Sequence, residues 1–303
     1  MNYALSTMWS QQDRFADIAE FARVAEAMGY DAIEVSHVTN AEKLDRLIDD
    51  ASVRLSGLHA PTPYERVGNK PNSDLNLAAL DETERRTAID HTKRTMDYAA
   101  RAGARYIVVH LGHVGTDLVQ AERTLRKLWD GGTREGADVD AARRETMEWR
   151  AEHAPAHLEH AKETLVELVA YASDRGLAIG LENRLHHQEF PLPHEALDLV
   201  SDYPPDKVGY WHDVGHAEVQ WRLGFVDKHA WLDTVGQRTI GAHLHDVDGI
   251  GDHRAPGRGD VEWDYIARGL PKDALRVFEI NQRQPDDAVA GAIAFLRERG
   301  VVE

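Results

Sequence analysis

The feature that most constrains the fold is a regular alternation of short apolar, β-branched runs with longer amphipathic stretches. Eight runs have the length and composition of buried strands, and they occupy residues 3–8, 31–35, 54–59, 106–110, 178–182, 208–213, 239–245 and 276–280. Parallel strands need a crossover between them, and that crossover is usually a helix. Eight such units are the number that closes a (β/α)8 barrel. The predicted fold class is therefore α/β, as one barrel.

The stretches between the runs carry helix signals. Residues 13–28 place apolar side chains at helical spacing, among them Phe15, Ile18 and Ala22, and Gly29 follows as a helix stop. The segments ARAGARYIVVHLG and ASDRGLAIGLEN have the same order, because in each a glycine ends a helical stretch just before an apolar strand. The chain thus repeats one structural unit without repeating its sequence.

Nothing in the composition divides the 303 residues into separate domains. No linker rich in proline, glycine or serine interrupts the pattern, so residues 1–303 are predicted to form a single domain, a size that barrels with insertions reach. Residues 116–160 are longer than a barrel needs and rich in charge. We interpret them as a helical insertion at about 116–160 that serves as a lid or as an oligomer contact.

Composition excludes several classes of site and partner. The chain has no cysteine, so any metal must bind to histidine, aspartate or glutamate. Lys and Arg number 35 and Asp and Glu 52, and the net charge of −17 repels polyanions, so no nucleic acid partner is expected. No apolar run is long enough for a membrane span, and the first residues lack a secretory signal. A cytoplasmic location is expected.

Chemically useful side chains stand at the ends of the predicted strands. In barrels the active site is built from the carboxyl ends of the strands, and here those ends carry Glu34, His59, His110, Glu182, Asp213, His243 or His245, and Glu279. One such residue alone is ordinary. Carboxylates inside apolar strands such as AIGLEN and RVFEIN, however, cost several kcal/mol to bury unless a cation compensates them. The set therefore predicts a divalent metal site at the barrel mouth.

Glu182, Asp213, Glu279 and one histidine of the HLHD segment form the predicted ligand set. Mixed oxygen and nitrogen donors suit Mn²⁺, Mg²⁺, Co²⁺ or Zn²⁺. His243 and His245 are two residues apart and share a strand face, so the pattern alone leaves either of them as the ligand.

Three further residues are candidates for substrate binding or additional metal binding. His216 follows Asp213 by three residues across a turn, where both side chains can face one cavity. Arg258 lies between two glycines in a loop that either holds a phosphate or carboxylate of a small substrate or is an ordinary turn. Trp9 either forms an aromatic wall against a sugar ring or packs in the core.

The ordered segments GYDAIEV, GLHAP, VVHLG, GLEN, HDVGHA, HLHDVDG, DHRAPGRGDVEW and FEIN resemble the xylose isomerase-like TIM barrel superfamily, the sugar phosphate isomerase/epimerase group that also contains endonuclease IV. The resemblance covers essentially the whole chain. It implies that Glu182, Asp213, His243 and Glu279 hold the metal. It also implies that Glu182 and Glu279 act as the catalytic acid/base pair on either face of the substrate.

Endonuclease IV adds further histidines to this comparison. Its additional zinc-binding histidines correspond to His59, His110, His216 and His253, with His245 as a further candidate beside them. In the family an aspartate stands two residues before the last of these histidines, whereas Gly251 holds that place here and Asp252 is adjacent. This departure puts a third metal in doubt.

The resemblance supports three enzymatic hypotheses and one alternative without catalysis. The first is a metal-dependent isomerase or epimerase of a sugar, sugar phosphate or related polyol, which abstracts a proton beside a carbonyl to form a metal-stabilised enediolate. The second is a dehydratase of the keto-inositol or dehydroshikimate type, and the third a zinc phosphodiesterase like endonuclease IV. A binding protein without turnover is the remaining alternative. The expected partner is a small carbohydrate, and a homo-oligomer is compatible with the charged insertion.

Overall fold

Eight parallel strands close into a barrel whose order around the ring follows the chain. The computed structural model describes residues 3–50 and 52–303. The ring order is β1-β2-β3-β6-β7-β8-β9-β12, with β12 pairing with β1. The strand bounds are β1 (Tyr3–Ser6), β2 (Ala32–Val35), β3 (Leu55–His59), β6 (Tyr106–Val109), β7 (Ala178–Glu182), β8 (Val208–Asp213), β9 (Thr239–Leu244) and β12 (Leu275–Phe278). The predicted barrel is confirmed, and each strand lies within two residues of its predicted bounds.

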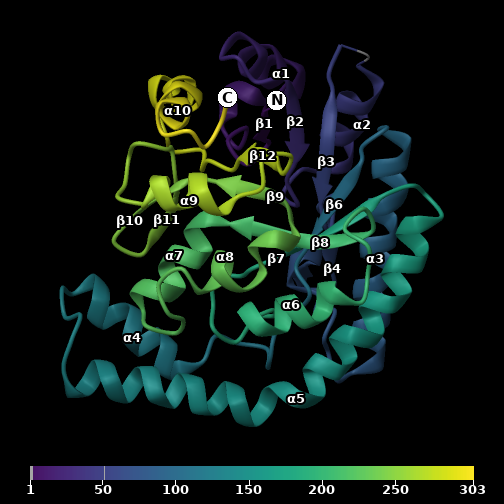
Figure 1. Cartoon of the computed structure of the whole chain (residues 1–303). Helices are drawn as coiled ribbons and strands as arrows, with labels where there is room; N and C mark the ends of the chain where they lie inside the picture. Colours follow the sequence, from purple (N-terminus) through teal and green to yellow (C-terminus); the bar gives the residue numbers. More distant parts are fainter. Residues whose placement is uncertain (1–2, 51) are drawn as a thin grey trace.

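Helices cover the outside of the barrel (Figure 1). Those of the crossovers and the chain end are α1 (Ile18–Ala27), α2 (Ala41–Asp49), α3 (Glu82–Arg101), α6 (Pro193–Ser201), α7 (Val214–Arg222), α8 (Ala230–Val235), α9 (Trp263–Gly269) and α10 (Asp286–Glu298). The helix predicted over 13–28 is divided, because Asp17 caps α1 by accepting a hydrogen bond from the backbone of Ala19. A short 3₁₀ turn, η1 (Asp13–Phe15), precedes that cap.

Two helices occupy the segment that was predicted as an insertion. They are α4 (Gln120–Asp130) and α5 (Ala137–Ser173), and α5 lies along one side of the molecule (Figure 1). The 37-residue α5 also provides the crossover to β7, so part of the insertion and the barrel helix are one continuous element. Arg150 of α5 forms a two-pronged ion pair with Glu195 of α6, at 2.9 and 2.7 Å. This bond fixes α5 against the barrel helices.

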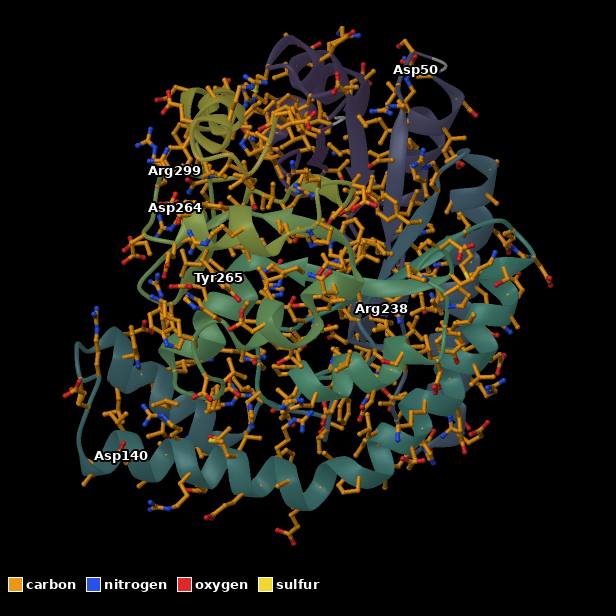
Figure 2. All side chains as sticks on the ribbon, viewed as in Figure 1. Asp50, Asp140, Arg238, Asp264, Tyr265 and Arg299 are labelled. Atoms are coloured by element: carbon orange, nitrogen blue, oxygen red, sulfur yellow. The ribbon has the colours of Figure 1, made fainter. Side chains whose placement is uncertain are left out.

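Side-chain contacts also join neighbouring outer helices. Tyr265, labelled in Figure 2, lies on α9, and its hydroxyl donates to the carbonyl of His229 and to Asp233 of α8 at 2.7 and 3.0 Å. No helix among the described residues is both long and apolar enough to cross a membrane.

Aromatic rings form a floor in the barrel interior. Tyr106 and Trp211 pack with ring centroids 4.7 Å apart, and Trp211 lies 5.3 Å from the ring of His243. Glycine is required beside them, because a Cβ on Gly57 would lie 2.2 Å from Tyr106 and one on Gly241 would lie 2.1 Å from Trp211. The floor fills the barrel below the strand ends and supports the side chains above it.

Two hairpins extend beyond the strand ends. The first joins β4 (Arg66–Val67) to β5 (Lys70–Pro71), and the second joins β10 (Asp246–Asp248) to β11 (Gly251–Arg254). Neither was predicted. The second hairpin matters for function because it carries Asp252 and His253 over the barrel mouth.

Candidate metal centre

Four strand-end side chains meet at the carboxyl end of the barrel. Glu182 ends β7, Asp213 ends β8, His243 lies on β9 and Glu279 follows β12. Their nearest ligand atoms all lie within 4.8 Å of one another. Nδ1 of His243 is 3.3 Å from Oε1 of Glu182 and 3.2 Å from Oε2 of Glu279. We call these four residues the quartet.

The quartet has the chemistry of a divalent metal site. All four residues are buried, with exposed fractions of 2% or less. Three ionised carboxylates buried around one small space repel each other and lose hydration, and a cation bound among them would compensate both costs. Three carboxylates and one imidazole provide such a site with suitable donors.

The surrounding charges keep the quartet carboxylates ionised. Burial by itself would raise the pKa of Glu182, but neighbouring histidines hold that pKa well below its usual range. The pKa of Glu279 is likewise lowered by His243 and His253 despite burial. Both carboxylates are therefore available as bases and as ligands at neutral pH.

Hydrogen bonds distinguish His243 from His245. Nδ1 of His245 accepts the backbone N–H of His253 at 2.8 Å, while its Nε2 lies 3.0 Å from both carboxylate oxygens of Asp213. This arrangement places the ring proton on Nε2, where it is donated to Asp213. His245 then has no free lone pair for an ion, which favours His243 as the ligand.

Glu34 lies behind His243. Its Oε1 is 2.8 Å from Nε2 of His243, and its Oε2 accepts the hydroxyl of Tyr106 at 3.0 Å. A carboxylate on the far nitrogen of a metal-binding histidine fixes the ring and raises its basicity. The sequence places Glu34 at a strand end, but its partner was not predictable because it comes from a strand 209 residues away.

A second group brings together His59, His110 and Glu182. Oε2 of Glu182 lies 3.0 Å from Nε2 of His59 and 2.8 Å from Nε2 of His110. The other nitrogen of His59 faces the carbonyl of Ala60 at 3.1 Å, so Nε2 is the nitrogen that faces the site. Glu182 is thus shared between this group and the quartet.

A third group consists of His216, Asp252 and His253. Asp252 Oδ1 lies 3.2 Å from Nδ1 of His253, and its Oδ2 lies 3.7 Å from Nε2 of His216. Adjacent strand residues normally face opposite sides, but His253 has a φ of 54°, in the left-handed region. This conformation lets Asp252 and His253 share one side. Residue spacing alone had cast doubt on this group.

His245 comes together with Asp213, His253 and Glu279 in a further group of possible ligands, whereas Trp9 and Arg258 belong to none of these groups. Trp9 is fully buried against Phe15, with ring centroids 5.5 Å apart, and its indole N–H donates to the carbonyl of Gln284. Packing therefore accounts for Trp9. The Arg258 side chain is half exposed and pairs with Asp287 at 3.2 Å rather than with any member of the centre.

Two residues beside the second group were not predicted as site residues. His37 follows β2, and its ring centroid lies 5.0 Å from that of His59. Burial lowers the pKa of His37 to about 3, and its buried Nδ1 has no hydrogen-bond partner among the described residues. Arg184 follows Glu182 by two residues, and its Nη1 lies 2.5 Å from Nε2 of His110. Position just after a strand end was the only sequence signal for either.

Comparison with known proteins identifies the family. The family model described as xylose isomerase-like TIM barrel matches residues 21–299, which is most of the chain. The chain belongs to this xylose isomerase-like family. The resemblance that the sequence motifs indicated is thereby confirmed.

The individual proteins to which this chain is similar are distant in sequence. A protein named uncharacterized protein MJ1311, from Methanocaldococcus jannaschii, is 27% identical over 230 residues, covering 74% of this chain and 67% of the relative. A structure titled D-tagatose 3-epimerase-like protein is 20% identical with a TM-score of 0.66, covering 99% of this chain and 97% of the other. The TTHB071 protein from Thermus thermophilus, soaked with ZnCl2, is 20% identical with a TM-score of 0.63, at 99% and 98% coverage. At these identities the two structures establish the fold.

Proposed function

We propose that this protein is a divalent-metal-dependent isomerase or epimerase that moves a proton at a carbon beside a carbonyl of a sugar, sugar phosphate or related polyol. The observation that carries the proposal is the quartet, in which two buried, ionised glutamates, Glu182 and Glu279, flank one metal-binding space. The epimerase-like neighbour supports the same reaction class.

Glu182 and Glu279 come from the ends of two different strands. Glu182 ends β7 and Glu279 follows β12, with His243 between them at 3.3 and 3.2 Å. One carboxylate removes the proton beside the carbonyl and becomes a carboxylic acid, and the other, after taking a proton from water, returns one to the enediolate. A pair of positioned bases of this kind contributes roughly 10²–10⁴-fold to the rate. When bound in the quartet, a divalent ion polarises the carbonyl and stabilises negative charge on the enediolate.

The surrounding histidines provide hydrogen-bonding groups for the hydroxyls of a polyol. His110 is the more open of the second group, with a side chain that is 22% exposed, and His253 is 16% exposed. These side chains are more exposed than those of the buried quartet. A substrate that enters the mouth therefore meets imidazoles first and the reactive carboxylates at its inner end.

Solvent exchange tests the proposal. The protein is loaded with Mn²⁺, Co²⁺ or Zn²⁺ and incubated in D2O with a panel of ketoses, ketose phosphates and keto-polyols. NMR then detects deuterium at the carbon beside the carbonyl. We expect exchange with at least one substrate and its loss in Glu279→Gln, which removes charge with little change in size. Exchange coupled to loss of water would identify a dehydratase. The absence of exchange across the panel would exclude both proton-transfer reactions.

A second candidate is a multinuclear phosphodiesterase. The second and third groups favour it, because metal ions bound close together can activate water and stabilise both the attacking and the leaving oxygen of an in-line displacement. The net charge of −17 opposes a nucleic acid substrate. Hydrolysis of bis(p-nitrophenyl) phosphate by the zinc-loaded protein, without deuterium exchange on any sugar, would favour this candidate.

A further inference from the structure

Arg184 brings a fixed positive charge to the second group. Its Nη1 lies 2.5 Å from Nε2 of His110. Its Nε and Nη2 lie 3.1 and 3.0 Å from Oε1 of Glu189. One edge of the guanidinium is thus held by a carboxylate, while the remaining nitrogen points at the imidazole.

The position of Arg184 is set by the loop that carries it. The carbonyl of Arg184 accepts a hydrogen bond from Nε2 of Gln220 at 2.6 Å, which ties the loop to α7. Oε2 of Glu189 accepts the backbone N–H of His186 at 2.8 Å. The carboxylate that holds the guanidinium is therefore itself fixed to the backbone.

Helix α4 holds the same loop from the other side. Glu122, fully buried, lies 2.8 Å from Nδ1 of His186 and accepts the backbone N–H of His187 at 3.1 Å. Arg126 donates to the carbonyl of Leu185 at 3.1 Å. The described contacts thus fix the segment around Arg184 at both ends, and Arg184 has little freedom to leave His110.

The contact uses the lone pair that a metal ion would need. Arginine only donates hydrogen bonds, so its approach to Nε2 of His110 requires an unprotonated, accepting nitrogen. A metal ion binds a neutral imidazole through the same lone pair. One lone pair cannot serve both, so a metal ion on His110 and Arg184 on His110 exclude each other.

Charge leads to the same conclusion. Oε2 of Glu182 lies 2.8 Å from Nε2 of His110, so two electron-rich atoms face each other at this point. A cation beside them relieves their repulsion, and the guanidinium of Arg184 is that cation.

We propose that Arg184 is the built-in cation of the His59, His110 and Glu182 group and keeps a metal ion off His110. The group then faces the substrate with an imidazole and a guanidinium, and metal binds at the quartet. This inference concerns the number and place of the ions, and it holds whichever reaction the centre performs.

Metal counting tests the inference with Zn²⁺ alone as the probe. Equilibrium dialysis at saturating Zn²⁺, followed by elemental analysis, gives the ions bound per chain. We expect Arg184→Gln to bind one more ion than the wild type. A second substitution, His110→Ala, should return the count to the wild-type value. An unchanged count in Arg184→Gln, or a gain that survives His110→Ala, would overturn the proposal.

A matched control separates the charge from loop loosening. Arg126→Gln removes a bond to the same loop without touching His110, and its zinc count should equal that of the wild type. An extra ion in Arg126→Gln would assign the effect to loop mobility and contradict the role of Arg184.

The wild-type background gives an independent measurement that does not need Arg184→Gln to fold. His110→Ala alone should leave the zinc count unchanged, because His110 does not bind an ion while Arg184 is present. Loss of one ion per chain in this variant would overturn the inference. Deuterium exchange has no part in these readouts, so they are separate from the test of the proposed reaction.

Discussion

At the level of single residues, the centre depends on which nitrogen of each histidine is held. Glu34 lies 2.8 Å from Nε2 of His243, so Nδ1 is the nitrogen that faces the other three members of the quartet. The backbone N–H of His253 holds Nδ1 of His245. Two histidines that are equivalent in the sequence therefore have different roles, and the difference comes from neighbours distant in the chain.

Glu34→Gln should weaken metal binding. The substitution removes the charge that raises the basicity of His243 while keeping its approximate shape, and the loss of such a partner typically costs 10–100-fold in metal affinity. Competition with a chromophoric chelator measures the affinity. Glu298→Gln, on an exposed side chain of α10, is the control and should be unchanged. Equal affinity of Glu34→Gln and wild type would show that Glu34 does not support the metal site.

His187 should make the fold sensitive to acid. Burial lowers its pKa to about 4, below the ordinary value of 6.5. As pH falls below 6.5, the unfolded chain binds a proton that the folded chain does not, so stability is present above about 6.5 and is lost toward pH 4.

The His187 contribution can be isolated by substitution. At pH 5 it costs about 2 kcal/mol, because each pKa unit corresponds to roughly 1.4 kcal/mol. His187→Phe keeps the stacking on Phe225 but cannot titrate. Unfolding by urea with chelator present, at pH 7.5 and pH 5, should show a smaller loss in the variant. Identical losses would contradict the prediction.

At the level of elements, the strands were predictable and the loops were not. Strand positions follow from apolar runs, and their carboxyl ends meet because parallel strands in a barrel share one direction. That is why Glu182, Asp213, Glu279 and one histidine of the HLHD segment could be named from strand positions, while the choice of His243 over His245 came from the family resemblance. These four side chains lie together in the structure. The side of the chain on which Asp252 lies depends instead on the left-handed φ of His253, which spacing does not encode.

Arg184 illustrates the same limit. Its contact with His110 depends on a loop held by Glu189, Gln220 and helix α4, and all three contacts are formed only in the folded chain. The sequence pattern therefore identifies the ligands at the strand ends, but it does not identify the contact between Arg184 and His110.

Helix α4 should depend on Glu122. This buried carboxylate pairs with Arg126 at 2.9 Å, contacts the ring of His186 and accepts the backbone N–H of His187. Its removal therefore leaves these groups without a partner. Glu122→Ala should destabilise the fold by about 3 kcal/mol, the range for breaking a buried ion pair. Chemical unfolding measures the loss, with Glu135→Ala at an exposed position as the control. A change no larger than that of the control would show that α4 is held by other contacts.

At the level of the whole molecule, the metal should link the strands around the barrel. The quartet takes one side chain each from the ends of β7, β8, β9 and β12, so an ion there joins four strands. A ligand at about 1,000 times its dissociation constant stabilises a fold by about 4 kcal/mol.

Chelation should therefore lower the thermal midpoint, and Mn²⁺, Co²⁺ or Zn²⁺ should restore it. Asp213→Asn should lose most of this response, while Asp287→Asn, at an exposed position outside the centre, should keep it. A midpoint indifferent to chelator and metal would show that the carboxylates are compensated without an ion.

Anomalous diffraction from crystals of the Zn²⁺-loaded protein, collected on both sides of the zinc edge, tests the central claim most directly. We expect the strongest peak among Glu182, Asp213, His243 and Glu279, and none on Nε2 of His110 beside Arg184. A strongest peak between His59 and His110, or no peak in the quartet, would contradict the account.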